Sequence, residues 1–317
     1  MVTRQLPALL SCSGLARDAA EPLAGTAGHA AGCVLMSYPK RLWATDALAS
    51  PGLPDALRAQ TQRLALERDV VTRLIAPEGP WTGRTEVLFF PQGLRFRDVP
   101  LDAVGSLLDA AARDALPYGS EPVTLPVLAC CTHGQRDRCC ALHGFALARA
   151  LREEASAAGI AVEVREASHL GGDRFAPSVL ALPSGHMHGH VEPSQARALL
   201  EATARGEPLL ERFRGSLWHD PLAQLVEHAL WCLGGPDARD LLLGPPHERA
   251  LGKTQCELRC KASWRGQPAI VVARCDREEH SIAGDCHSLE EGALSRIDRW
   301  RVTELWAEPT GRARPST

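Results

Sequence analysis

Four cysteines fall within eleven residues of the chain, in the adjacent pairs Cys130-Cys131 and Cys139-Cys140. The stretch between the two pairs is short and polar, with Arg136 and Asp137 near its end. Thiolate sulfur binds soft metal ions and attacks disulfides, so clustered cysteines indicate a metal site or redox chemistry. Core packing alone does not account for four cysteines this close together.

Two regular elements are expected to hold these thiols. The apolar run 123–129 is typical of a buried strand, and the periodicity of residues 145–158 predicts a helix. The cysteines would then lie in a strand-to-helix loop, which can be accessible and still be held by rigid elements. Cys130 should point to the opposite side of the strand from Cys131, into the core.

A second polar stretch follows a predicted strand over 161–166 and contains His169, Gly171-Gly172 and Asp173. Paired glycines allow positive φ and a close approach of the backbone to a bound group. We expect His169 and Asp173 to reach the end of the sheet at which Cys131 and Cys140 lie. Thiolate and imidazole ligands suit zinc or an iron–sulfur cluster.

The element order of this region repeats an earlier one. Residues 90–113 can be laid over residues 182–205: both begin at a Pro-x-Gly turn, continue through a strand and end in a Leu/Ala-rich helix. Each copy reads as a β-α-β-β-α unit, so we predict an α/β (α+β) fold with a duplicated thioredoxin-like unit. The expected elements are 32–37, 53–67, 69–75, 86–90, 94–99 and 101–115, then 123–129, 145–158, 161–166, 178–182, 187–191 and 194–204.

Three domains are expected from this layout. Residues 1–118 would form a thioredoxin-like domain without cluster ligands, since its only cysteine near the equivalent place is Cys33. Residues 119–206 would form the domain with the cysteines. Residues 207–317 would contain a helix over 218–232 and a small antiparallel sheet built from 256–262, 269–274 and 297–306.

The remaining clustered thiols are predicted to be structural. Cys256 and Cys260 share one face of a predicted strand, but their separation of about 13 Å is too long for one metal ion. Cys275 and Cys286-His287 are interpreted in the same way. His133 is expected to orient its loop by hydrogen bonding, and Arg136 and Asp137 to pair with each other or with loop carbonyls.

Composition narrows the class of protein. The chain has 317 residues, 45% hydrophobic and 23% charged, with a net charge of −3. This balance favours neither nucleic acid nor an anionic membrane as a partner, and no apolar run is long enough to span a bilayer. Leu9–Cys12 resembles a lipoprotein cleavage site, but its apolar segment is short and Pro7 interrupts it. We therefore expect a cytoplasmic protein, in which eleven cysteines are not a disulfide framework.

The cysteine stretch 131–140 and the His169–Asp173 stretch resemble motifs of the sucrase/ferredoxin-like family of thioredoxin-like [2Fe–2S] ferredoxins. The resemblance implies that Cys131 and Cys140 bind one iron of the cluster and His169 the other. It also implies one-electron transfer with a redox partner protein, so we expect an electron carrier rather than an enzyme with its own substrate. The segments that carry the resemblance are 131–140, 168–172, 174–177 and 182–185, with 11–16 and 25–27 similar to the N-terminal signature of the family.

One ligand departs from the family pattern, which is His-x-Gly-Gly-His after the cysteines. Asp173 stands at the second histidine position. A carboxylate is harder than imidazole and anionic, so as an iron ligand it should lower the reduction potential. Other candidates for this ligand are Cys139 and three histidines: His186, His188 and His190. The histidines alternate along one predicted strand, so their side chains share a face. That face could point toward the cysteines or could be exposed to solvent.

Two other classes of function fit the same residues. The vicinal pairs Cys130-Cys131 and Cys139-Cys140 could serve a thiol-based redox enzyme or sensor, although the Cys-x-x-Cys spacing that lowers a thiol pKa is absent. A zinc-bound scaffold that binds a partner through its C-terminal sheet is the third possibility. No pair of carboxylates is placed for glycoside hydrolysis.

Overall fold

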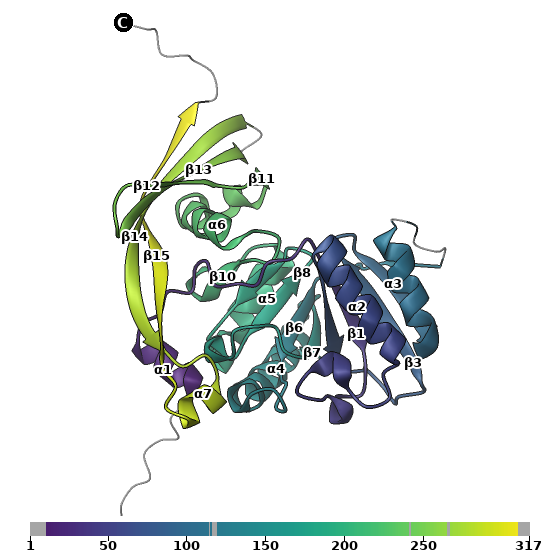
Figure 1. Cartoon of the computed structure of the whole chain (residues 1–317). Helices are drawn as coiled ribbons and strands as arrows, with labels where there is room; N and C mark the ends of the chain where they lie inside the picture. Colours follow the sequence, from purple (N-terminus) through teal and green to yellow (C-terminus); the bar gives the residue numbers. More distant parts are fainter. Residues whose placement is uncertain (1–10, 114, 116–118, 241, 265–266, 310–317) are drawn as a thin grey trace, which may run out of the picture.

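The computed structural model describes residues 11–113, 115, 119–240, 242–264 and 267–309. Its core is a mixed ten-stranded sheet, and a second sheet of five antiparallel strands stands at one end of the molecule (Figure 1). The order of strands in the large sheet is β10-β9-β8-β6-β7-β2-β1-β3-β4-β5. The fold is therefore α/β, as the sequence predicts.

The first half of the large sheet has a simple order. β1 (Gly32–Ser37) pairs in parallel with β2 (Val70–Ile75) and antiparallel with β3 (Arg84–Phe90), which pairs with β4 (Leu94–Pro100). Helices α2 (Asp55–Arg68) and α3 (Val104–Ala112) pack on one face of these strands. The short strand β5 (Glu121–Pro122) extends the edge.

The second half repeats this arrangement. β6 (Val127–Cys131) pairs in parallel with β7 (Glu163–Ala167) and antiparallel with β8 (Val179–Leu182), which pairs with β9 (His186–His188). Helices α4 (Arg138–Ala158) and α5 (Ala196–Ala204) pack on one face. The orders β2-β1-β3-β4 and β7-β6-β8-β9 correspond, which confirms the predicted duplication of the thioredoxin-like unit.

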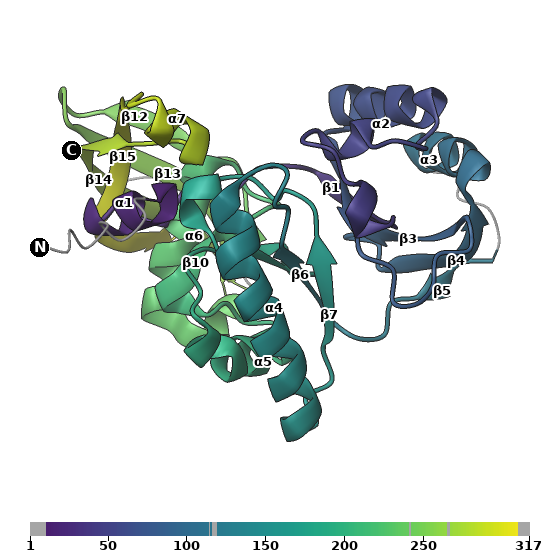
Figure 2. The ribbon, with the colours of Figure 1, turned by 90° about the horizontal axis from the view of Figure 1, so that it is seen from below.

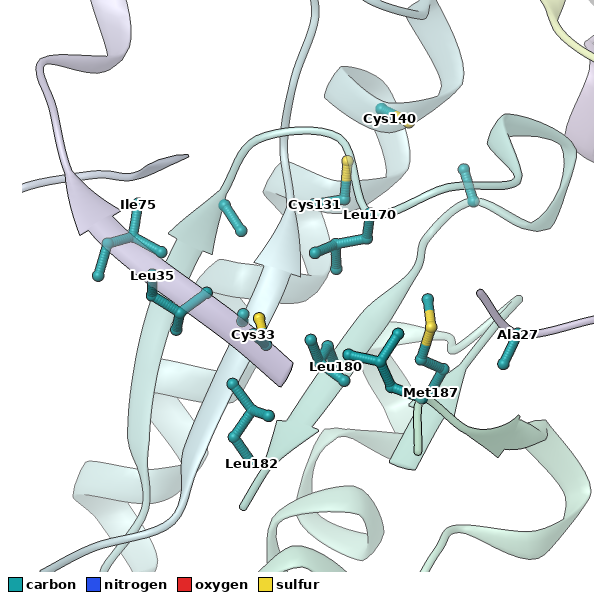
Figure 3. Close-up of a cluster of buried hydrophobic side chains, with 14 of the residues drawn as sticks. Ala27, Cys33, Leu35, Ile75, Cys131, Cys140, Leu170, Leu180, Leu182 and Met187 are labelled. Carbon is teal, nitrogen blue, oxygen red and sulfur yellow. The ribbon is translucent and has the colours of Figure 1, made fainter. Parts of the chain in front are cut away.

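The two halves also pack against each other. They meet in the sheet at one antiparallel pair, Ile75 with Ala167. The faces not covered by helices form one buried cluster, in which Cys33 and Leu35 of β1 lie across from Leu180 and Leu182 of β8 (Figure 3). Figure 2 shows the two units side by side. The first unit therefore covers the inner face of the second. The domain boundaries at 118/119 and 206/207 remain a prediction.

Helix α4 begins seven residues earlier than the periodicity predicts, at Arg138 instead of Phe145. Asp137 is its N-cap and accepts a hydrogen bond from the Cys139 backbone N–H at 2.7 Å. Residue 144, inside this helix, must be a glycine because a β-carbon there would overlap the carbonyl oxygen of Cys131. The second cysteine pair is consequently on the first turn of a helix and not in a loop.

The C-terminal third holds α6 (Pro221–Gly234) and the five-stranded sheet, in which the long strands β13 (Gln255–Trp264), β14 (Gln267–Ile282) and β15 (Ser295–Pro309) are neighbours. β11 (Leu242–Leu243) and β12 (His247–Ala250) both pair with β13. Six of the described helices and strands lie outside the predicted ones: α1 (Cys12–Asp18), β10 (Phe213–Ser216), α7 (Cys286–Glu290) and the short strands β5, β11 and β12. The 3₁₀ helices are Lys40–Leu42, Ala47–Ala49, Leu101–Ala103, Asp173–Phe175, Pro193–Gln195, Leu210–Arg212 and Gly235–Asp240.

Replacing Gly144 tests the close approach of α4 to β6. We expect Gly144→Ala to reduce the free energy of unfolding by about 1–3 kcal/mol, because helix and strand must move apart. Gly105→Ala is the matched control, since Gly105 is also helical and its added β-carbon meets only the Gln60 side chain at 3.7 Å. Urea denaturation should show no loss for the control; equal losses in the two variants would contradict the packing argument.

Candidate functional site

Alternation along β6 separates the first cysteine pair. Cys130 packs in the cluster beneath α4 and donates a weak hydrogen bond to the Gly144 carbonyl, with 3.6 Å between Sγ and O. Cys131, the last residue of the strand, points into the cluster between the two units. The prediction that Cys130 is a core residue is confirmed.

The second pair is divided by the helix. Successive residues of a helix point about 100° apart, so Cys139 and Cys140 face different neighbours. Cys140 lies beside Cys131, and Figure 3 shows both at the edge of the same buried cluster. Cys139 instead contacts the sulfur atoms of Cys12 and Cys286.

His169 and Asp173 arrive from the loop after β7. Because β6 and β7 are parallel, their carboxyl ends lie next to each other, and this loop meets the start of α4. Gly171 and Gly172 have φ of 97° and 76°, values at which the backbone of a residue with a side chain would be strained. The His169 backbone N–H donates to Nδ1 of His133 at 3.3 Å, so His133 orients the loop as expected.

Cys131, Cys140 and His169 offer ligand atoms that all lie within 4.8 Å of one another. Asp173 touches two members of this group: its Oδ1 is 3.3 Å from Cys140 Sγ and 3.0 Å from His169 Nδ1. Its Oδ2 is 3.5 Å from Arg136 Nε. The structure thus brings all four predicted residues together, and Arg136 pairs with Asp173 rather than with Asp137.

Burial and close contacts set the charges of the group. A hydrogen bond from Cys140 outweighs burial and holds the pKa of Cys131 well below its usual range, whereas the same bond raises that of Cys140. Burial favours neutral His169, but contacts with Asp173 and Cys131 raise its pKa to about 9. Burial is likewise overcome at Asp173, whose pKa His169 lowers. The site therefore stabilises the thiolate of Cys131, the form of cysteine that binds metal.

The alternative ligands lie elsewhere. His186 packs against Phe213 and Trp231, and His188 Nε2 accepts a hydrogen bond from the Leu209 N–H at 3.1 Å. His190 accepts from Arg17 and lies beside Ser13. All three histidines are buried, so the interpretation of a solvated face is wrong: β10 and α6 cover this strand. None belongs to the group formed by Cys131, Cys140 and His169.

Sequence reasoning missed a second group of ligand atoms, which combines Cys139 with Cys12, Asp137 and Cys286. Cys286 was predicted to be only structural. The other thiols so predicted are consistent with that role, since Cys256 and Cys260 lie buried in the core of the small sheet. One feature of the sequence could have pointed to this group: Asp137 precedes the helix that contains Cys139, a position typical of an N-cap.

The described residues also form a groove of about 1140 Å³. It is lined by α6 and β15, including Leu225, His228 and Trp300, and contains none of the predicted ligands. Among the described residues, no helix combines the length and hydropathy that crossing a bilayer requires.

Comparison with known families matches the sucrase/ferredoxin-like family over residues 23–215, more than half of the chain. The chain belongs to the sucrase/ferredoxin-like family. This confirms the resemblance seen in the motifs, and the matched region contains Cys131, Cys140, His169 and Asp173. Comparison with curated proteins gives no match. Among solved structures, a thioredoxin-like [2Fe–2S] ferredoxin from Aquifex aeolicus is 17% identical with a TM-score of 0.26, and the likeness covers 29% of this chain and 92% of that one.

The residues of this sucrase/ferredoxin-like chain fit a metal centre by their donor types. Two sulfur atoms and an imidazole converge at one point, and Cys131 and Cys140 are 1% and 2% exposed. Nδ1 of His169 is close to Asp173 but has no hydrogen-bond partner of good geometry among the described residues. Thiolate and imidazole are the donors that zinc and iron–sulfur centres use. The group could therefore hold a metal.

The Gly-Gly turn provides a test of how the His169 loop is held. A β-carbon at Gly172 would lie 2.7 Å from Nη2 of buried Arg214, whereas one at Gly171 meets nothing within 4 Å. Both substitutions strain a positive φ, so we expect Gly172→Ala to lose about 1–3 kcal/mol more stability than Gly171→Ala. Urea denaturation of both variants measures this, and a larger loss in Gly171→Ala would contradict it.

Proposed function

We propose that this protein carries single electrons on a [2Fe–2S] cluster held by Cys131, Cys140, His169 and Asp173. The observation that carries the proposal is the convergence of two thiols and an imidazole within 4.8 Å in a member of the sucrase/ferredoxin-like family. When bound, such a cluster supplies a reversible one-electron redox couple. No catalytic residues are assigned.

The chain contributes binding, orientation and shielding. Cys131 and Cys140 supply thiolates from a buried position that excludes water. The His169 amide is held by His133, and Arg136 places a positive charge beside Asp173. We assign Asp173 as the fourth ligand because it is 4% exposed and touches Cys140 and His169.

The route for electrons is expected to pass His169. Its side chain is 27% exposed, whereas those of the two cysteines are almost fully buried. A redox partner protein that docks on this edge would come closest to the iron that the imidazole binds. The partner would be a reductase or an electron acceptor.

The arrangement of thiols weighs against a thiol-based redox enzyme. Cys130 and Cys131 point to opposite faces of β6, and Cys139 and Cys140 belong to different groups. Neither adjacent pair is thus presented to a substrate as a dithiol. All four sulfur-bearing side chains are also at most 2% exposed.

Cluster content tests the proposal directly. Anaerobically reconstituted protein should contain about two iron and two acid-labile sulfide per chain and show a visible spectrum that dithionite bleaches. Cys131→Ala, Cys140→Ala and His169→Ala should each lose most of the iron, because each removes a ligand. Cys130→Ala, which removes the neighbouring buried thiol, should keep it.

A colourless protein after reconstitution would refute the cluster. Equal loss of iron in Cys130→Ala and Cys131→Ala would show that the ligands are wrongly assigned.

The fourth ligand is tested by the reduction potential. Asp173→His replaces an anionic donor with a neutral one, so the midpoint potential should rise by on the order of 100 mV with the cluster retained. Asp173→Asn is the control for the loss of charge without a new imidazole. Protein-film voltammetry gives the potentials, and identical values in wild type and both variants would place Asp173 outside the coordination sphere.

A further inference from the structure

Cys12, Asp137, Cys139 and Cys286 form a compact group beside the proposed cluster site. Their ligand atoms lie within 4.8 Å of one another, and none of the four residues is more than 5% exposed. They come from three distant parts of the chain: α1, the start of α4 and α7. Figure 1 shows α1 and α7 side by side near this end of α4.

The three sulfur atoms form a nearly regular triangle. Cys12 Sγ is 3.6 Å from both Cys139 Sγ and Cys286 Sγ, and the latter two are 3.3 Å apart. Thiolates bound to one tetrahedral zinc at about 2.3 Å lie about 3.8 Å apart. A disulfide would need about 2.05 Å, and three thiols cannot pair completely. The spacing is therefore that of ligands around a common ion.

Asp137 completes the arrangement. Its Oδ1 accepts from the Cys139 N–H and its Oδ2 from the Cys286 N–H, each at 2.7 Å. The same Oδ1 is 3.9 Å from Cys12 Sγ. One carboxylate thus fixes the backbones of two cysteines and presents an oxygen to the third. Such preorganisation favours a fourth ligand in a closed site.

α7 needs such an anchor. It has only five residues, too few to be stable alone, and lies between the long strands β14 and β15. Partly buried Leu289 of α7 packs against the central buried cluster, and Glu290 forms an exposed ion pair with Arg138 of α4. An exposed ion pair contributes little. A metal bound by Cys286 and Cys139 would link α7 directly to the start of α4.

We propose that Cys12, Cys139 and Cys286, with Asp137, bind one structural Zn²⁺ that joins α1 and α7 to the start of α4. Three thiolates and a carboxylate make a four-coordinate site with no open position, which suits zinc in a structural role. Because Cys139 precedes Cys140, the ion also fixes the turn of helix that carries a proposed cluster ligand. The zinc site does not depend on whether iron binds at the other group.

Zinc analysis of the full chain is the primary test. Protein equilibrated anaerobically with one equivalent of ZnCl₂ and then gel-filtered should retain about one zinc. Its zinc-edge X-ray absorption should show three sulfur ligands at about 2.3 Å and one lighter ligand. The number of sulfur ligands identifies the site, because zinc bound by the group of Cys131 and Cys140 would have two and zinc bound by the group of Cys12, Cys139 and Cys286 three.

Variants identify the ligands. Cys12→Ala and Cys286→Ala should lose at least tenfold in zinc affinity, measured by competition with a chromophoric chelator. Cys260→Ala is the matched control, because Cys260 is a fully buried thiol of the C-terminal sheet outside the group. Asp137→Asn should weaken zinc more than His143→Ala, since His143 hydrogen-bonds Cys139 but lies outside the group.

The proposal would be overturned if the wild type retained no zinc, if the zinc had fewer than three sulfur ligands, or if Cys260→Ala and Cys286→Ala lost equal zinc affinity. Iron bound by these cysteines in place of zinc would also overturn it. If the cluster test fails and zinc is still bound by three sulfurs, the zinc site stands alone.

Discussion

The close approach of α4 to the end of β6 is the constraint on which the site depends. The helix can pass over the Cys131 carbonyl only because residue 144 has no side chain. Asp137 fixes the first turn of the same helix by capping it. Together these two residues set the height and rotation at which Cys139 and Cys140 are presented. Without them, the sulfur atoms of these cysteines would not be held at defined positions relative to Cys131.

Parallel pairing of β6 and β7 supplies the other half of the site. It places the His169 loop beside the start of α4, and the turn at Gly171-Gly172 directs Asp173 back toward Cys140. The first thioredoxin-like unit contributes none of the four predicted ligands, yet β1 buries the face of the sheet on which Cys131 lies. The duplication therefore has a physical role: one unit carries the donors and the other excludes water from them.

The local sequence pattern was sufficient to predict most helices and strands of the two thioredoxin-like units. The apolar run of β1 and the spacing of Leu57 and Leu64 in α2 are signals within one element, and both elements were predictable. The start of α4 was missed because a polar stretch and Gly144 mask the helical period. The burial of His186 and His188 was missed because β10 and α6, which cover them, come later in the chain.

The second group of thiols shows where sequence reasoning ends. Cys12 and Cys286 are 274 residues apart, and neither lies in a recognisable ligand spacing. Only the packing of α1 and α7 around Asp137 brings them together. Contacts of this kind depend on the whole fold, so no pattern within one element can report them.

The most direct test of the central claim is pulsed EPR of dithionite-reduced protein labelled with ¹⁵N-histidine. The proposed ligands predict a paramagnetic [2Fe–2S] centre with one strongly coupled histidine nitrogen, from His169, and strongly coupled nitrogen from no other residue. A reduced cluster without any histidine coupling, or with two, would contradict this account of the site.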